Sequence, residues 1–377
     1  MISVEYSGRG SIHNLGALLD YYQSKAVFLV TGRGSFESSG ARAAVDPALR
    51  SRRIVRFSEF SPNPTGDDVR RGVELFRDSG ADVVVAIGGG SAIDVAKIIN
   101  ACAGHDGDPT DFIANRRTLV SPGLPLVAVP TTAGTGAEAT HFSTVYLEGV
   151  KHSAASEHML PAHAILDPDL TASVPPGITA STGIDALAQG IESYWSVNAT
   201  DASRKWAREA VERAFGHLAG AVASGEGDDR DHMLVAANLA GKAINVSRTT
   251  APHALSYKLT SDFGVPHGHA VGLTLGTVFE FNSKVVTADA TDPRGARFSR
   301  ARIAEMCSAL GCADAAAARD ALTQMMCRIG LETRLSKLGV TRSDLPALAG
   351  AVNEERLVNN PRRLPASAIG EILEAIY

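Results

Sequence analysis

The chain has 377 residues, of which 45% are hydrophobic and 20% charged, a composition typical of a globular protein with two domains. Its formal net charge of −5 argues against the basic face that nucleic-acid binding requires. The four cysteines form no C-x2-C pair, no apolar signal segment opens the chain, and no apolar run approaches a membrane span of roughly 20 residues. We therefore expect a protein of the reducing cytoplasm, without a nucleic-acid or membrane partner.

The first half of the chain alternates short apolar runs with helical patterns, as parallel strands joined by crossover helices do. Strands are expected at residues 25–31, 53–57, 82–87 and 125–129. The third of these runs is continuously apolar, which is typical of a strand buried on both faces of a sheet. The pattern therefore predicts a Rossmann-like α/β dinucleotide-binding domain over residues 1–182.

Beyond Pro175-Pro176-Gly177 the pattern changes to long stretches with helical periodicity and few strand signals. Helices are expected at residues 206–222, 233–245, 300–310 and 315–329. The second half of the chain, residues 183–377, is therefore predicted to be an all-α domain.

Two loops after predicted strands have the composition of phosphate-binding loops. The first, Gly88-Gly89-Gly90-Ser91, leads into a helix, where backbone N–H groups and the helix dipole can meet a pyrophosphate. It is not the Rossmann G-x-G-x-x-G pattern, because Ile93 occupies the last glycine position. The second loop, Thr131–Gly136, offers hydroxyls and free amides. Taken alone, a tight strand-to-helix turn and an ordinary loop would also explain the two segments.

Four potential metal ligands lie in the helical half of the chain. Asp185 and Gln189 are four residues apart, so they share one face of a helix, and His253 and His267 follow later. One carboxylate, two imidazoles and an amide oxygen can hold a divalent cation such as Fe²⁺ or Zn²⁺. Spacing alone supports this site weakly, because a single histidine on a helix is usually a packed or hydrogen-bonded residue.

These segments, in this order and at these separations, resemble the iron-containing (group III) alcohol dehydrogenase family. The family motif G-G-G-S-x-x-D-x-x-K corresponds to residues 88–97, P-T-T-x-x-T-G-x-E to 130–138, D-P-x-L to 167–170, G-x-D-A-L to 183–187, and H-x13-H to His253 and His267. The match spans nearly the whole chain. It implies the dehydroquinate synthase-like fold, an NAD(P)-dependent alcohol dehydrogenase or aldehyde reductase activity, and a bound metal.

The resemblance also implies roles for individual residues. Asp185, Gln189, His253 and His267 would hold the metal, expected to be Fe²⁺ with Zn²⁺ or another divalent ion as the alternative. The cofactor-binding residues would be Gly32, Arg33, Gly89, Gly90, Ser91, Asp94, Thr131, Thr132, Thr135, Lys151 and Leu170. NADPH is the expected cofactor, with NADH as the alternative, because Gly32 stands where NAD-restricted members carry an acidic residue and Arg33 can pair with a 2′-phosphate.

The sequence departs from the family at two positions. The family normally has a histidine where Gln189 stands, and usually a second one where Tyr257 stands. An amide oxygen is a harder and weaker donor than imidazole, so we expect a lower metal affinity and less preference for Zn²⁺. Two alternatives stay open: a water fills the position of Gln189, or the metal is lost.

The segment before His253 suggests the substrate. Arg248, Thr249 and Thr250 stand where typical family members have small apolar residues, and a guanidinium flanked by hydroxyls can hold an oxyanion or a phosphonate. Lys258 is a further candidate for substrate binding, and the segment 242–272 resembles the phosphonoacetaldehyde reductase branch of the family. For Arg248 and Lys258 a solvated surface role is the alternative.

The sequence thus predicts metal-dependent, NAD(P)H-linked reduction of phosphonoacetaldehyde to 2-hydroxyethylphosphonate in phosphonate biosynthesis. Asp185, His253 and His267 would be catalytic through the metal, and the proton would come from water or a hydroxyl relay, with Tyr257 and His269 as the candidates. The expected partners are a small anionic aldehyde and, in a homodimer, a second copy of the chain. Three rival functions are kept: a generic short-chain alcohol dehydrogenase, a dehydroquinate synthase-like lyase that consumes no net NAD(P)H, and a metal-free binding protein.

Overall fold

A computed structural model describes residues 3–225, 227–352 and 357–377. They form two compact units, one of residues up to Thr132 together with Gly136–Val174, the other of Ala133–Thr135 together with Pro175–Tyr377. We call these the N-terminal and the C-terminal unit. The division at Val174 lies before the predicted boundary at residue 182, because helix α7 (Pro176–Trp195) already begins at Pro176 and continues through that residue.

The N-terminal unit is built on a six-stranded parallel sheet with the order β1-β8-β5-β4-β2-β3. Its strands are β1 (Val4–Ser7), β2 (Ala26–Thr31), β3 (Arg53–Phe57), β4 (Val83–Gly88), β5 (Leu126–Pro130) and β8 (His163–Leu166). The four predicted strands correspond to β2, β3, β4 and β5. The two others, β1 and β8, pair with each other although they lie at opposite ends of the unit's sequence.

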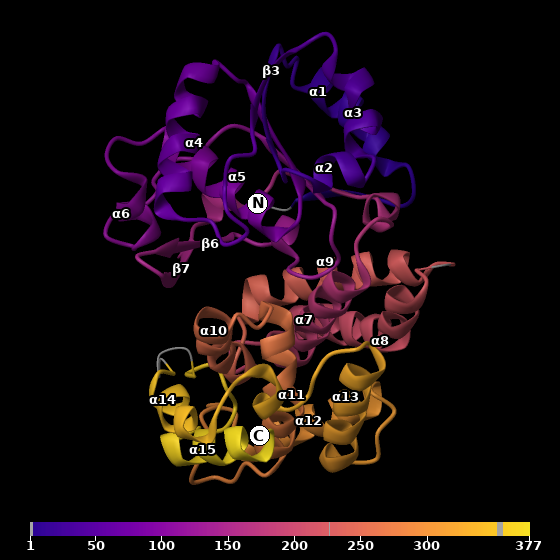
Figure 1. Ribbon diagram of the computed structural model, residues 1–377, viewed down its shortest axis with the longest axis vertical. Coiled ribbons are helices and arrows are strands. Elements are labelled where there is room, and N and C mark those ends of the chain that lie inside the picture. The colour runs from indigo at the N-terminus through magenta and orange to yellow at the C-terminus, as the bar shows by residue number, and fades with distance from the viewer. Residues whose placement is uncertain (1–2, 226, 353–356) are drawn as a thin grey trace. The chain divides into compact units, whose positions relative to one another are not determined.

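Helices cover both faces of this sheet (Figure 1). They are α1 (Asn14–Tyr21), α2 (Ser35–Ser38), α3 (Ala41–Leu49), α4 (Gly66–Ser79), α5 (Gly90–Ala103) and α6 (Pro109–Ile113). Alternate residues of β4 enter two different cores: Val83 and Val85 pack with residues of α1 and α3, whereas Val84 packs with residues of α4 and α5. This double burial explains why the strand is apolar at every position.

A two-stranded antiparallel hairpin stands apart from the sheet of the N-terminal unit. Its strands are β6 (Phe142–Leu147) and β7 (Val150–Ala155), with Gly149 at a φ of 79° in the turn. Only a residue without Cβ adopts that backbone conformation without strain, so the glycine permits the tight reversal. The hairpin carries Lys151, one of the residues that the sequence assigns to the cofactor.

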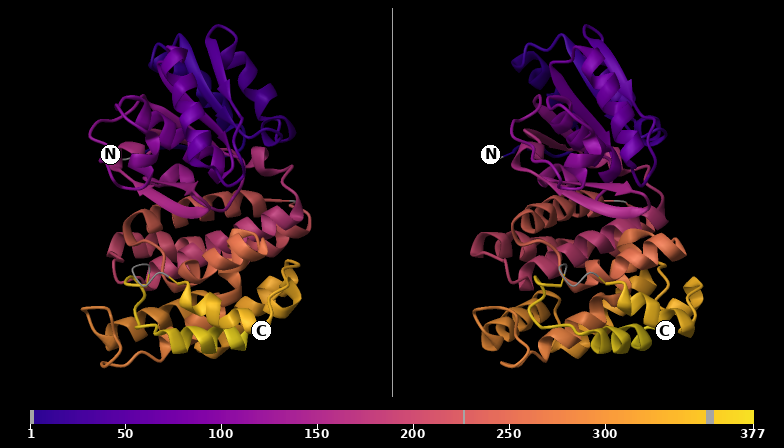
Figure 2. Two further views of the ribbon diagram at one scale, coloured as in Figure 1. Left: turned by 60° about the vertical axis from the view of Figure 1, so that its left-hand side comes forward. Right: turned by 90° about the vertical axis from the view of Figure 1, so that its left-hand side faces the viewer.

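The C-terminal unit has helices as its named elements (Figure 2). After α7 they are α8 (Asp201–Ala223), α9 (Asp229–Ser247), α10 (Ala251–Phe263), α11 (His267–Ser283), α12 (Ala296–Ala309), α13 (Ala315–Arg328), α14 (Leu345–Gly350) and α15 (Ala366–Ala375). The four predicted helices correspond to α8, α9, α12 and α13. One large apolar core joins them, and α7 is buried along almost its whole length. The α/β-plus-helical fold class predicted from the sequence is confirmed.

Within the described ranges, every helix is too short or too polar to cross a membrane.

Candidate active site

The predicted cofactor loops meet at one edge of the parallel sheet. Strands β2, β4 and β5 are neighbours, and their carboxyl ends lead into the loops at Gly32, Gly88–Ser91 and Thr131. Two backbone hydrogen bonds join these ends: Gly32 N–H donates to the carbonyl of Ile87 at 3.4 Å, and Thr131 N–H donates to that of Gly88 at 2.9 Å. Folds of this kind bind nucleotides at the carboxyl ends of the parallel strands, at the point where the strand order reverses.

Close approach explains the glycines of these loops. A Cβ on Gly88 would lie 2.7 Å from Ala92 Cβ and 3.2 Å from the backbone nitrogen of Gly32. Helix α5 starts directly afterwards, and among the described residues no side chain caps its N-terminus. Its first N–H groups and its dipole are therefore available to an anion such as a pyrophosphate.

The D-x-x-K part of the same motif ties α5 to the β6–β7 hairpin. Asp94 Oδ2 accepts the N–H of Thr144 at 2.9 Å. Lys97, fully buried, lies 3.6 Å from Asp94 Oδ1 and donates to Thr140 Oγ1 and to the carbonyl of Phe142, both at 3.0 Å. Burial lowers the pKa of Lys97, and the neighbouring Asp94 opposes that shift. Both side chains therefore have a structural role in holding the hairpin.

The remaining cofactor candidates have different surroundings. Ser91 Oγ donates to the carbonyl of Pro62, and Arg33 forms an exposed pair with Glu59 at 2.9 Å. The hydroxyl of Thr131 is buried and has no hydrogen-bond partner among the described residues. Leu170 differs from the prediction: its side chain is 3% exposed and packs into the core beneath the sheet, so it offers no surface to a cofactor.

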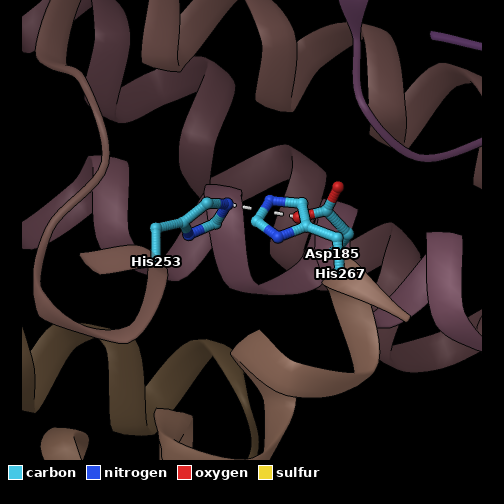
Figure 3. A group of neighbouring side chains, drawn as sticks. All are labelled: Asp185, His253 and His267. Atoms are coloured by element: carbon cyan, nitrogen blue, oxygen red, sulfur yellow. Dashed lines mark ion pairs between the residues drawn. The ribbon is translucent and has the colours of Figure 1, made fainter. Parts of the chain in front are cut away.

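Three of the four predicted metal ligands converge from three helices. Asp185 on α7, His253 on α10 and His267 on α11 each offer a ligand atom, and these atoms lie within 4.8 Å of one another (Figure 3). Asp185 Oδ1 is 3.2 Å from His253 Nε2, and the two imidazole rings stand at 77° with their centroids 5.5 Å apart. Nothing in the linear sequence brings α10 and α11 to α7, so the convergence is a result of the fold.

Gly268 permits the approach of α11 to α7. A Cβ at this position would overlap the carbonyl oxygen of Ser181 and would lie 2.8 Å from Asp185 Cβ. The glycine after His267 thereby places that imidazole beside the carboxylate.

The cluster favours a cationic occupant. Burial by itself lowers the pKa of His253, but the carboxylates of Glu192 and Asp185 outweigh it and raise that pKa to about 9. Without a metal the two carboxylates therefore hold His253 as an imidazolium at neutral pH. A metal ion must displace this proton, because only the neutral imidazole ligates.

The amide of Gln189 fits the role of a fourth ligand. Gln189 follows Asp185 by one helical turn and is 4% exposed. Its Oε1 atom is buried and accepts no hydrogen bond from the described residues. A buried carbonyl oxygen without a donor costs roughly 1–3 kcal/mol, and a cation would satisfy it. The donor set of one carboxylate, two imidazoles and an amide oxygen therefore suits a divalent metal ion.

Glu192, which was not among the residues predicted from the sequence, is fully buried on α7 and contacts the predicted ligand His253. Its Oε2 contacts His253 Nδ1, and its Oε1 accepts the N–H and the hydroxyl of Thr250, both at 2.9 Å, and the N–H of His253 at 3.4 Å. A signal for it was present: Glu192 lies seven residues after Asp185 and three after Gln189, so helical spacing places it on the same face as these two ligands.

The predicted substrate residues differ from one another in their exposure and in their contacts. Thr250 is 1% exposed and is engaged by Glu192, while Lys258 forms a surface ion pair with Asp262 at 2.5 Å. Arg248 follows the last turn of α9 and is exposed, as the solvated alternative for this residue expects. Thr249 is partly buried, and its carbonyl accepts an N–H of Asn359 at 3.3 Å. The hydrogen bonds of Thr250 are therefore internal to the protein, whereas the exposed ion pair of Lys258 can open in water, so its contact with a substrate stays a prediction.

The two candidate proton donors also differ from each other. Tyr257 is half-buried, and its ring stacks on that of His267 at 6.2 Å between centroids and 16° between planes. His269 is buried, with Nε2 2.6 Å from the carbonyl oxygen of Glu332. The engaged Nε2 of His269 favours Tyr257 as the proton donor, and that role of Tyr257 stays a prediction.

The fold and the site define a two-unit protein with a nucleotide-binding sheet edge and a buried cluster of metal-binding side chains. Residues 5–168 match the family described as iron-containing alcohol dehydrogenase, and residues 179–377 match the C-terminal part of the Fe-containing alcohol dehydrogenase family. The chain belongs to the iron-containing alcohol dehydrogenase family and is an NAD-dependent oxidoreductase of alcohols and aldehydes. This confirms the family and the enzyme class predicted from the sequence.

Individual relatives act on different substrates. The chain is 36% identical over 323 residues to phosphonoacetaldehyde reductase of Streptomyces viridochromogenes, covering 82% of this chain and 80% of that protein. It is 32% identical to 4-hydroxybutyrate dehydrogenase of Cupriavidus necator, covering 92% and 91%. The structure of sulfoacetaldehyde reductase from Bifidobacterium kashiwanohense in complex with NAD⁺ matches with a TM-score of 0.90 and 31% identity, covering 99% of this chain and 96% of that one.

Proposed function

We propose that the chain catalyses the metal-dependent, NAD(P)H-linked reduction of phosphonoacetaldehyde to 2-hydroxyethylphosphonate, a step of phosphonate biosynthesis. The observation that carries this proposal is the position of Arg248, which lies five residues before His253 and is joined to the ligand cluster through Thr250 and Glu192. The relatives named above support it, because phosphonoacetaldehyde, sulfoacetaldehyde and 4-hydroxybutyrate each carry an anionic group a few atoms from the reacting carbon.

The backbone of Arg248 supports a functional role for this residue. Its φ of 61° and ψ of 169° lie in a region that is almost exclusive to glycine and that costs roughly 1–3 kcal/mol for other residues. The conformation is held on both sides: Arg248 N–H donates to the carbonyl of Ile244 at 2.9 Å, and Thr250 is fixed by Glu192. A glycine would fit without strain, so an arginine here is consistent with selection for its guanidinium.

The residues of the site would bind a metal ion, orient the substrate and supply a proton. Asp185, Gln189, His253 and His267 would hold a divalent cation, Fe²⁺ in our proposal, with Zn²⁺ less favoured by the amide ligand. Such a cation supplies Lewis-acid polarisation of an aldehyde oxygen, and a bound nicotinamide supplies the hydride. Arg248 and the neighbouring N–H and hydroxyl of Thr249 would orient the phosphonate. The hydroxyl of Tyr257 would give its proton to the product oxygen and recover one from water.

We also propose that NADPH is used at least as well as NADH. Gly32 brings no carboxylate to the end of β2, and Arg33 directly follows it. The side chains of Arg33 and Glu59 are 66% and 71% exposed, and such an ion pair is weak in water. A 2′-phosphate can therefore compete with Glu59 for the guanidinium.

Gly32→Asp is expected to reverse this cofactor preference, with kcat/KM for NADPH falling at least about tenfold relative to NADH, one 1.4 kcal/mol step. The added carboxylate would repel a 2′-phosphate and accept from ribose hydroxyls. A Cβ at this position meets the hydroxyl of Ser35, which can rotate away. Gly32→Ala is the matched control, because it adds the Cβ without the charge. A wild-type enzyme that strongly prefers NADH would contradict the argument.

The test of the substrate is NADPH oxidation at 340 nm against aldehydes of similar length. We expect the highest kcat/KM for phosphonoacetaldehyde, a lower value for the singly charged sulfoacetaldehyde and succinic semialdehyde, and the lowest for propanal. Equal values for propanal and the anionic aldehydes would instead support a generic short-chain alcohol dehydrogenase.

A further inference from the structure

We propose that Glu192 is a positioning residue for the metal centre, which fixes His253 in the one tautomer and orientation that can ligate a cation. This inference rests on the metal site of the proposed function. Glu192 is not itself among the metal ligands, and it acts through His253.

The geometry assigns each oxygen of Glu192 a separate task. Oε2 receives the Nδ1–H of His253, and Oε1 receives three groups from the start of α10, namely the N–H and hydroxyl of Thr250 and the N–H of His253. A fully buried carboxylate is stable only when its lone pairs are satisfied in this way. The carboxylate is therefore locked in one orientation, and the imidazole with it.

The fixed carboxylate of Glu192 also determines the protonation of the other ring nitrogen of His253, Nε2. A neutral imidazole carries one proton, so a carboxylate at Nδ1 that can only accept leaves the lone pair on Nε2. That atom points into the ligand cluster, 3.2 Å from Asp185 Oδ1. Carboxylates behind metal-bound histidines hold the tautomer and raise the basicity of the ligand, and their loss commonly weakens metal binding 10–100-fold.

The same carboxylate also holds the chain that leads to the proposed substrate residue. The hydroxyl of Thr250 also accepts a buried hydrogen bond from Trp195 Nε1 at 2.9 Å, and the carbonyl of Ser247 accepts the hydroxyl of Ser196 at 2.6 Å. One end of α7 thus fixes both sides of Arg248 as well as His253. Loss of Glu192 should therefore weaken metal binding and loosen substrate orientation together.

Glu192→Gln tests the proposal, because glutamine has almost the same size but one donor face and one acceptor face. If its N–H faces His253 Nδ1, that atom must accept, and the ring proton moves to Nε2. If its oxygen faces Nδ1, its amide NH2 group faces the N–H of Thr250, and these two donors have no acceptor between them. Titration of the metal-free protein with Zn²⁺ in a calorimeter is expected to give a Kd about 10–100-fold weaker than wild type. With Co²⁺, the visible d–d spectrum should also change.

Tyr194→Phe is the matched control. It removes a partly buried hydrogen bond of the same helix, which Tyr194 donates to Glu305 at 2.5 Å and which does not involve His253. We expect Tyr194→Phe to lower Tm while leaving the Kd for Zn²⁺ within about threefold of wild type, a change under 1 kcal/mol. A Glu192→Gln protein that loses stability but binds Zn²⁺ within the same range would overturn the proposal, since the role would then be structural.

A measurement on the wild-type protein covers the case in which Glu192→Gln does not fold. In zinc-loaded protein labelled with ¹⁵N-histidine, long-range proton–nitrogen spectra should show His253 with the proton on Nδ1 and the metal on Nε2. A proton on Nε2 or a metal on Nδ1 would overturn the proposal. Wild-type protein that binds neither Zn²⁺ nor Fe²⁺ would instead refute the metal centre of the proposed function, and this result is separable from a failure at Glu192 alone.

Discussion

Asp185→Ala is expected to leave the purified protein without stoichiometric metal and without measurable aldehyde reduction. Asp185 is the one carboxylate among the four proposed ligands, and it lies 3.2 Å from His253 Nε2. Its loss removes both a ligand and the negative charge that offsets a cation in a buried site. Metal content by plasma mass spectrometry and NADPH oxidation on the same sample provide the two measurements.

Gln189 supplies the matched comparison for this experiment. Gln189→Ala should weaken metal binding, whereas Gln189→His should tighten it by about tenfold or more, the scale of one 1.4 kcal/mol step, because imidazole is the better donor. Metal content that stays unchanged in all three variants would show that the cation site has been placed wrongly. Tighter binding in Gln189→His with no effect of Gln189→Ala would mean that a water fills this position in the wild type.

Arg248→Ala is expected to lower kcat/KM for phosphonoacetaldehyde by about 30-fold, the lower end of the roughly 30- to 1,000-fold effects seen when a charge-assisted contact is truncated. The lower end applies because Arg248 is exposed, and water screens its charge before the substrate binds. Activity on propanal should change less than about twofold, since this aldehyde has no anionic group to orient.

Arg248→Gly separates the guanidinium from the backbone. It should lose the same activity on phosphonoacetaldehyde, yet its Tm should not fall, because glycine adopts a φ of 61° and a ψ of 169° without the strain that Arg248 bears. A loss of activity in this variant therefore cannot be attributed to unfolding. Equal losses on phosphonoacetaldehyde and propanal would contradict the phosphonate assignment and would give Arg248 a role in the fold or the metal site.

The framework of the protein could be predicted from the sequence because it depends on local patterns. The apolar run that becomes β4 is buried on both faces, and Gly88–Ser91 directly follows it, so strand, loop and helix are adjacent in the chain. The ligands Asp185 and Gln189 likewise share a helix face through their spacing alone. The family resemblance supplied the rest of the expected ligand set.

Elements that depend on long-range pairing were not predictable in this way. Strand β1 has four residues, two of them exposed, and it becomes a strand through its pairing with β8, more than 150 residues later. Leu170 has the right motif for a cofactor contact, but a turn capped by Asp167 packs it into the core.

Amino-acid identity by itself determined which chemistry the chain can perform: glycines for phosphate approach, and a carboxylate, an amide and two imidazoles for a cation. The tertiary structure alone decided which polar side chains lie at the site where that chemistry would take place. Thr250 resembles a substrate contact in the sequence, but its N–H and hydroxyl both donate to the buried Glu192. Glu192 shows the reverse case, because a glutamate reads as a surface residue until packing removes water around it and leaves His253 as its partner. Helix α10 packs on α11, which packs on α7, and the contacts of Glu192 join α7 to α10. This arrangement sets the orientation of the site, and no spacing in the sequence encodes it.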